Sequence, residues 1–317
     1  MSHLIENKAY VGETPWRGLG VPIANNLSAK EMQKVCGADF AVRKYPEFIE
    51  IKKDERHYTG NFSLVRSDTN TVLDSVSEEW LPVQNDEAFE FFHEFVHEGD
   101  MEMHTAGVLD YGRRVWCMAK VKESFSLFRG KDRIESNLLF SSSHQYGKST
   151  TVMSTPIRDV CNNTLQLALS GKSDMSVRVT HRRKFDPEVV KTTLRLNTKR
   201  LETYKEAAEF MASKTADPIE VLKFFSDLFP LTSNKNRKEG PSAISRNATA
   251  LMEILETQPG AKLGAGTWWA PFNAATYFVD HLAGQNDNNR LLSAFFGVGR
   301  ERKINALKLA TNYAKVA

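Results

Sequence analysis

The sequence predicts an α+β protein, in which an antiparallel, sheet-rich N-terminal domain is followed by an all-α C-terminal region. The main observation is a change in the spacing of apolar residues, from a period of about two over residues 38–181 to about 3.6 after Asp186-Pro187. The second is a composition of 41% hydrophobic and 26% charged residues, which suits one large core or two medium ones in 317 residues. We therefore expect a sheet domain over residues 1–185 and a helical region over residues 186–317.

In the N-terminal half, short alternating runs rich in Val, Thr, Ile and Phe predict strands, because Gly, Asp, Asn and Pro separate them. Three helices are expected between the strands: one that begins at the capping box Ser28-x-x-Glu31, one from Asn85 to a stop at Gly99, and one within Asp159–Leu169. The predicted strands are Phe40–Lys44, Phe48–Lys52, Tyr58–Arg66, Val72–Val76, Arg114–Val121, Asn137–Ser143, Thr150–Thr155 and Ser176–His181.

After Pro187 nearly the whole sequence has helical periodicity. The polar stretch over residues 232–241 interrupts it and predicts a loop or linker. The expected helices cover residues 187–213, 217–228, 241–257, 268–283, 289–296 and 300–316.

The apolar runs are short and the mean hydropathy is −0.41, so we expect no membrane span. The N-terminus lacks the basic-then-apolar pattern of an export signal. The three cysteines, Cys36, Cys117 and Cys161, lie far apart without metal-ligand spacing. These features favour a cytoplasmic protein and exclude a zinc ribbon.

Charge is distributed unevenly along the chain. Of the 42 Lys and Arg residues, 20 lie in residues 1–177 together with 25 of the 39 Asp and Glu residues, which gives that part a net charge of −5. The remaining 22 basic and 14 acidic residues give residues 178–317 a net charge of +8. Such an asymmetry indicates contact with nucleic acid, and the alternative is a set of solvated, Lys-rich helix faces.

Three motifs suggest catalytic or nucleotide chemistry, and each has a simpler explanation. The segment Ser142–Ser149 ends in Gly-Lys-Ser like a phosphate loop, but the β-branched residues after it and Pro156 predict a hairpin turn instead of the helix that would bind phosphate. His93 and His97 match the zinc-protease pattern HExxH, yet they fall beside the apolar stripe of their helix, where no third ligand is evident. Cys161 near Asn162 and Asn163 could form a nucleophilic site with His144, although a lone helical cysteine is more typical of a core.

The pattern that most strongly suggests a function consists of Arg and Lys residues between positions 178 and 199. Alternation places Arg178, Thr180 and Arg182 on one strand face, with Arg183 next in the chain. Lys191, Arg195 and Lys199 follow at four-residue intervals and form a single helical stripe that could track a phosphate backbone. The alternative is a solvated helix face that pairs with glutamates further along.

Further cations and aromatic residues could join this surface. Arg113, Arg114, Lys148 and Arg158 lie at turns of the sheet domain, where neighbouring hairpin tips can converge. Trp16 beside Arg17 has the residue types that single-strand binders use for stacking. Trp116 after Arg114 is a second candidate for stacking, and its alternation with Val115 and Cys117 is equally typical of a core residue. The pair Trp268-Trp269 begins a helix, and packing is its favoured role.

Six short motifs are spread over the chain: Thr14-Pro-Trp-Arg-Gly-Leu-Gly20, Leu81-Pro-Val-Gln-Asn85, Gly112-Arg-Arg-Val-Trp116, Ser143-His144, Thr155-Pro-Ile-Arg-Asp-Val-Cys-Asn-Asn-Thr164, and Thr267-Trp-Trp with Asp280-His281. Together they resemble the phage/plasmid-like protein family, which is described as a domain of unknown function, over about residues 10–310. The resemblance implies a mobile-element protein in a bacterial cytoplasm, acting in replication, recombination or evasion of host defence. The hairpins, basic turns and helical C-terminal region are also similar to the single-strand annealing proteins of phages and eukaryotes, which assemble into rings around a charged DNA groove.

The sequence therefore predicts a non-enzymatic protein that binds or anneals single-stranded DNA in phage or plasmid recombination or replication, as a homo-oligomer and without metal or cofactor. The alternative is an interaction module that binds a host protein, and a hydrolase that uses Cys161 or the pair His93/His97 is a third class. The residues expected to contact nucleic acid are Arg178, Arg182, Arg183, Lys191, Arg195, Lys199, Arg158, Lys148, Arg113, Arg114, Trp16 and Arg17.

Overall fold

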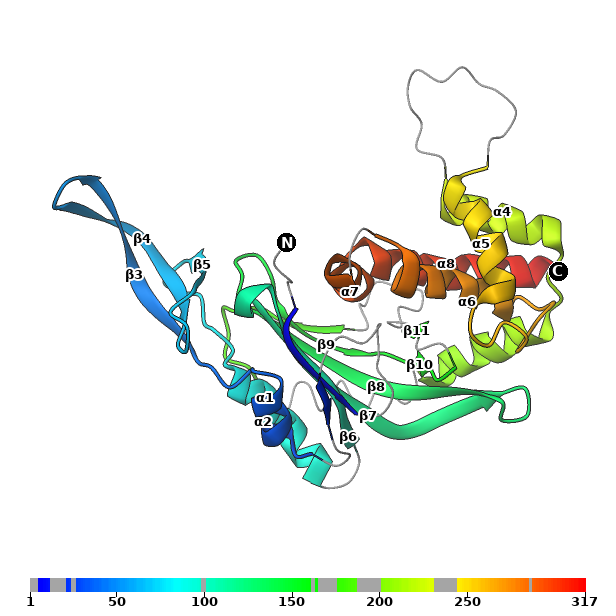
Figure 1. The fold of residues 1–317 in the computed structure, drawn as a ribbon, viewed down its shortest axis with the longest axis horizontal. Coiled ribbons are helices and arrows are strands. Elements are labelled where there is room, and N and C mark those ends of the chain that lie inside the picture. The colour runs from blue at the N-terminus through cyan, green and yellow to red at the C-terminus, as the bar shows by residue number, and fades with distance from the viewer. Residues whose placement is uncertain are drawn as a thin grey trace, which may run out of the picture. The chain divides into compact units, whose positions relative to one another are not determined.

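The fold is described from a computed structural model, over residues 5–11, 21–23, 27–97, 101–160, 163–164, 176–186, 201–230, 244–284 and 287–317 (Figure 1). As predicted, it is α+β, with sheets in the N-terminal half and helices after them. The chain divides into two compact units. The first is formed by Met1–Lys122, Asn137–Ser154 and Ser176–Leu196, and the second by Glu123–Ser136, Thr155–Met175 and Asn197–Ala317.

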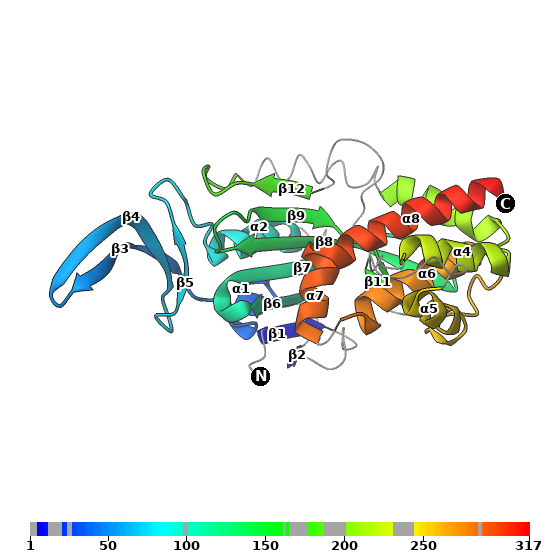
Figure 2. The same cartoon turned by 90° about the horizontal axis from the view of Figure 1, so that it is seen from above.

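The larger sheet has nine strands within the described residues, in the order β11-β10-β8-β7-β6-β1-β2, and β9 pairs with both β8 and β12. β1 and β2 run parallel, whereas β6 is antiparallel to both β1 and β7. In Figure 2, β12 lies at the border of the sheet, beside β9. The strands are β1 (Ile5–Val11), β2 (Val21–Ile23), β6 (Met101–Leu109), β7 (Arg114–Leu127), β8 (Asp132–Ser143), β9 (Thr150–Ser154), β10 (Ile157–Arg158), β11 (Asn163–Thr164) and β12 (Ser176–Val179).

A second, three-stranded antiparallel sheet consists of β3 (Val42–Lys52), β4 (Glu55–Arg66) and β5 (Val72–Val76). The sequence predicts two short strands where the structure has the single strand β3. The two segments join through Pro46, where the pairing with β4 shifts between Pro46 and Phe48. A bulge of this kind accommodates a residue that has no N–H to donate to the ladder.

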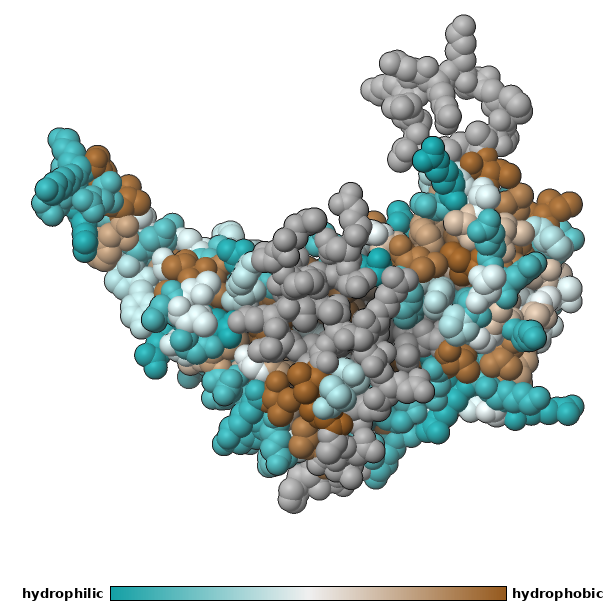
Figure 3. Space-filling view, viewed as in Figure 1, coloured by the Kyte–Doolittle hydropathy of each residue, from teal (hydrophilic) through white to brown (hydrophobic). Residues whose placement is uncertain are grey.

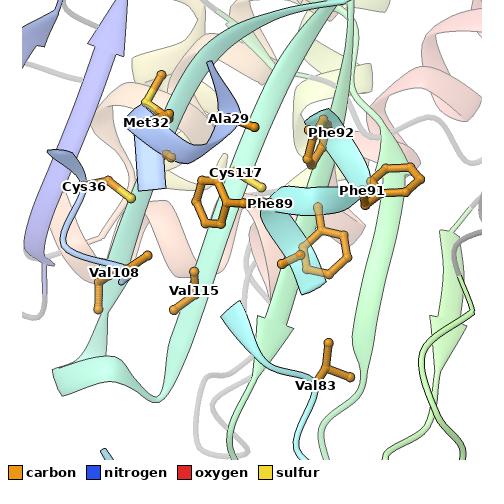
Figure 4. Close-up of a cluster of buried hydrophobic side chains, with 14 of the residues drawn as sticks. Ala29, Met32, Cys36, Val83, Phe89, Phe91, Phe92, Val108, Val115 and Cys117 are labelled. Carbon is orange, nitrogen blue, oxygen red and sulfur yellow. The ribbon is translucent and has the colours of Figure 1, made fainter. Parts of the chain in front are cut away.

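Two helices, α1 (Ala29–Val35) and α2 (Asn85–His97), cover one face of the larger sheet. The predicted capping box is confirmed, because Ser28 N donates to Glu31 Oε2 over 2.8 Å and Glu31 N donates to Ser28 Oγ over 3.2 Å. Figure 4 shows the core that results, in which side chains of both helices meet Val108, Val115 and Cys117 of the sheet. Burial of this apolar surface fixes α1 and α2 on the sheet.

The helices predicted after Pro187 are confirmed where the structure describes them; residues 187–200 of the first and 241–243 of the third lie outside the described residues. Residues 201–213 are helical. The π-helical turn Phe278–Leu282 directly follows α6. The other helices are α4 (Pro218–Leu228), α5 (Arg246–Thr257), α6 (Trp269–Tyr277), α7 (Asp287–Phe296) and α8 (Val298–Val316). Within the described ranges, no helix is long and apolar enough to cross a membrane.

Two sequence predictions need correction. β6 is not among the predicted strands, because its second half is buried at every position and so lacks alternation. The helix expected within Asp159–Leu169 is wrong where the structure describes this segment: Asn163–Thr164 form β11, which pairs with Ile157 and Arg158. The predicted loop over residues 232–241 lies outside the described residues, since 231–243 are not described.

Candidate nucleic-acid interface

Three turns of the first unit meet at one end of the larger sheet, which we call the turn end. They are the β6–β7 turn (residues 110–113), the β8–β9 turn (144–149) and the segment after β12 (180–183). His144 N donates to Arg113 O over 2.8 Å, which joins the first two turns. Val179 is paired with Thr150, so residues 180–183 run past the β8–β9 turn. The fold therefore places the tips of three distant segments together.

The turn end carries exposed cations. Lys148 lies in the β8–β9 turn, Arg182 and Arg183 follow β12, and all three are exposed. Arg178 is exposed on β12, opposite Thr151. These residues belong to the surface that the sequence predicts, and the structure brings them to the same end of the sheet.

Two exposed tyrosines also lie at the turn end, and the sequence prediction does not include them. Tyr111 in the β6–β7 turn is 44% exposed, and Tyr146 in the β8–β9 turn is 65% exposed. In each turn the tyrosine is followed by a glycine with positive φ, Gly112 and Gly147. The two Tyr-Gly pairs are visible in the sequence, but only the order of the strands shows that their turns lie at the same end of the sheet.

The β6–β7 turn presents Tyr111 through an unusual backbone. Asp110 and Tyr111 have φ of 52° and 57°, in the left-handed region that non-glycine residues rarely occupy. A Cβ on Gly112 would lie 3.0 Å from Arg66 Cδ and 3.1 Å from Phe40 Cζ. Arg66 is buried over the Phe40 ring and forms an ion pair with Asp68 at 2.7 Å. This packing holds the turn in its strained conformation, which costs about 1–3 kcal/mol per residue.

Two buried histidines of the turn end do not contribute charge to it. His144 is fully buried with Nε2 3.1 Å from Asn85 Oδ1, and burial lowers its pKa to about 3, assisted by the nearby His181. His181 stacks on Trp80 with ring centroids 4.0 Å apart, and burial lowers its pKa as well. Both imidazoles are therefore neutral at pH 7, so the positive charge of the turn end comes from Lys and Arg.

Arg113 and Arg114 lie at the turn end but make contacts within the protein. Arg113 Nε donates to Leu73 O over 2.7 Å, and its Nη1 is 3.6 Å from Asp110 Oδ2. Arg114 Nη1 donates to Ser141 Oγ over 3.3 Å, and burial lowers its pKa to about 10. We assign both arginines to holding the turns in place.

Arg158 belongs to the second unit and is not available to a phosphate. Its guanidinium is buried and donates to Asp132, with Nε 2.7 Å from Oδ1. Trp269 Nε1 donates to the same carboxylate over 2.8 Å. Asp132 is itself fully buried, so the sequence expectation of a phosphate contact does not fit Arg158.

Several predicted residues lie outside the described residues: Trp16, Arg17, Lys191, Arg195, Lys199 and Cys161. Trp116, Trp268 and Trp269 are buried, which confirms packing as their role. The hairpin predicted for Ser142–Ser149 is also confirmed, because β9 follows the turn and pairs antiparallel with β8. His93 is exposed, and in the part of the chain that is described no group of three or more His, Cys, Asp or Glu residues could hold a metal ion.

Fold and site together define an α+β protein in which one end of the larger sheet carries exposed cations and tyrosines. The chain belongs to the family described as "Domain of unknown function (DUF932)", which matches residues 72–304. The matched region includes the whole turn end. No curated protein and no solved structure matches the chain.

Proposed function

We propose that this protein binds single-stranded DNA at the turn end and acts as a binding or annealing protein in the recombination or replication of a phage or plasmid. The observation that carries the proposal is that exposed Tyr111 and Tyr146 lie at the same end of the sheet as exposed Lys148, Arg182 and Arg183. Single-strand binders combine cations that follow the backbone with aromatic side chains on which bases stack.

The two kinds of side chain contribute differently. Each stacked base is worth about 1–3 kcal/mol and is read without sequence preference, because every base has a π-face. Each phosphate that a cation neutralises releases counterions, so affinity falls with salt by a logarithmic slope of about 0.7 per contact on single strands. Binding of this kind requires neither a metal nor a nucleotide cofactor.

The setting of this activity comes from the resemblance to phage/plasmid-like proteins and, at the level of architecture, to single-strand annealing proteins. We propose a corresponding setting for this protein: a bacterial cytoplasm, in which it assembles into ring-shaped homo-oligomers on single-stranded DNA. Fold analogy alone does not fix function, and the side chains of the turn end supply the specific support.

The test is fluorescence anisotropy with a labelled single-stranded oligonucleotide across a salt series. We expect the triple variant Lys148/Arg182/Arg183→Ala to bind more weakly and to lower the salt slope by about 2, at about 0.7 for each lost contact. We expect Tyr111/Tyr146→Ala to bind at least about tenfold more weakly with the salt slope unchanged, because stacking releases no counterions.

The matched control is Lys52/Lys53/Arg56→Ala, which removes three exposed cations from the hairpin β3–β4. It should retain both affinity and slope, since these residues lie away from the turn end. Equal losses of affinity in both triple variants would show that only the net charge of the protein matters. They would rule out the turn end as the binding site. Absence of binding by the wild type at low salt would reject single-stranded DNA as the ligand and favour a host protein as the partner.

A further inference from the structure

The outer part of the hairpin β3–β4 exposes an unusual amount of apolar surface. β5 pairs with β4 only from Phe62 onwards, so residues 47–61 form a two-stranded ribbon, which we call the arm. Figure 1 shows the arm extending beyond β5, and Figure 3 shows apolar residues on it among hydrophilic ones. Its exposed fractions are 54% for Phe48, 51% for Ile49, 60% for Ile51 and 49% for Tyr58.

The arm exposes apolar groups on both of its faces. Phe48 is paired with Tyr58, and their ring centroids lie 5.7 Å apart on one face. Ile49 is paired with His57 and points to the opposite face, because successive side chains alternate. An isolated two-stranded hairpin is only marginally stable in water, so the arm needs a partner that covers these groups.

The charges of the arm indicate which partner fits. Lys52, Lys53 and Arg56 are interspersed with four carboxylates, those of Glu47, Glu50, Asp54 and Glu55. Glu50 is paired directly with Arg56 across the ribbon. A DNA backbone would repel these carboxylates, whereas a surface with both signs is complementary to a second copy of itself about a two-fold axis.

We propose that the arm is a homodimerisation element, in which the arms of two chains pack their apolar side chains against each other. The contact uses side-chain faces, because Pro46 and the adjacent bulge interrupt the outer edge of β3 and limit edge-to-edge pairing. The arm contains no residue of the turn end. Dimerisation is therefore independent of the DNA binding proposed above.

The test is the mass of the full-length protein in the absence of oligonucleotide, measured by light scattering and sedimentation over a range of concentrations. We expect a dimer, twice the chain mass of 35.8 kDa, that dissociates on dilution. The variant Phe48/Ile51→Ser should weaken association at least about tenfold while the circular dichroism spectrum stays that of the wild type. Ile219→Ser is the matched control, because Ile219 is 79% exposed on α4 and should not affect association.

A wild type that stays monomeric at the highest concentration would overturn the proposal and leave a different macromolecule as the partner of the arm. So would a dimer, or a larger assembly, whose association Phe48/Ile51→Ser leaves unchanged. Because no DNA is present, none of these results depends on the turn end. The two proposals can thus fail separately.

Discussion

At the scale of single residues, burial decides what a charged side chain can do. Arg158 and Arg182 look alike in the sequence, since each lies just beyond a run of β-branched residues. In the structure Arg158 is 4% exposed and shares the buried carboxylate of Asp132 with Trp269, whereas Arg182 is exposed. A buried guanidinium keeps its charge only with such partners, so Arg158 serves the core of the second unit.

Burial of His144 makes stability depend on pH in a defined direction. The pKa of His144 is about 3 in the folded protein, whereas an unperturbed histidine has a pKa of 6.5. His144 therefore binds a proton more readily in the unfolded chain. Stability is therefore fully present above pH 6.5 and is lost as the pH falls toward 3. Between pH 7.5 and 5.5 we expect His144 to reduce the free energy of unfolding by about 1.4 kcal/mol.

This pH dependence can be measured by urea denaturation of the wild type and of His144→Asn at both pH values. Asn cannot titrate, so the variant should lose about 1.4 kcal/mol less between the two pH values, whatever its stability at pH 7.5. His181, whose pKa burial also lowers, supplies a remaining pH dependence that is common to both proteins. Equal losses in wild type and variant would show that His144 is not the responsible group.

At the scale of elements, the local spacing of apolar residues and the helix caps predicted most of the helices and strands. The capping box of α1, the strands β5 and β9 and the C-terminal helices follow from spacing and caps that lie within a few residues of one another. β6 was missed because burial on both faces removes alternation. The pairing of Asn163–Thr164 with β10 was missed because a two-residue strand depends on its neighbour and has no periodicity of its own.

The candidate site was predicted in part for the same reason. Alternation and turn residues identified Arg178, Arg182 and Lys148. The importance of Tyr111 and Tyr146 depends on strand order, which brings together two turns that are more than thirty residues apart in the sequence. No local pattern carries that information.

The β6–β7 turn provides a test of how an element supports the site. Gly112 has φ of +96°, and a Cβ there would lie 3.0 Å from Arg66 Cδ. Gly130 in the β7–β8 turn has φ of +86° with no atom within 4 Å of a Cβ. We expect Gly130→Ala to cost about 1–2 kcal/mol of stability from backbone strain alone. Gly112→Ala should cost about 1–3 kcal/mol more, because the added methyl group overpacks the turn.

Thermal or urea denaturation of the two variants measures this difference. Gly112→Ala should also weaken binding of single-stranded oligonucleotides, since it displaces the turn that carries Tyr111, while Gly130→Ala leaves binding unchanged. Equal destabilisation by the two substitutions would mean that Arg66 and Phe40 do not constrain the turn.

At the scale of the whole molecule, the change in the spacing of apolar residues and the two compact units of the structure divide the chain at different places. The change of period lies near residue 186, but the second compact unit also includes Glu123–Ser136 and Thr155–Met175. Within that unit Phe125 packs against Tyr204 with ring centroids 5.7 Å apart, and Asp132 accepts from Trp269. A helical region cut at residue 186 would lose these partners.

This difference predicts how two fragments behave. Residues 123–317 contain every segment of the second unit and should show helical circular dichroism with a cooperative thermal transition. Residues 186–317 should unfold without cooperativity, because removing Asp132 leaves the Trp269 N–H without its buried acceptor, which costs about 1–3 kcal/mol. Tyr204 also loses Phe125 and keeps only Trp269 of these two aromatic neighbours.

Tryptophan fluorescence makes the comparison direct. Trp268 and Trp269 are the only tryptophans in either fragment, and both are fully buried in the intact chain. Their emission should be blue-shifted in the fragment 123–317 and should move toward that of solvated indole in 186–317. A shorter fragment that unfolds cooperatively, with the emission maximum of the longer one, would establish the helical region as a domain on its own. The hairpin that carries Asp132 would then be dispensable for that core.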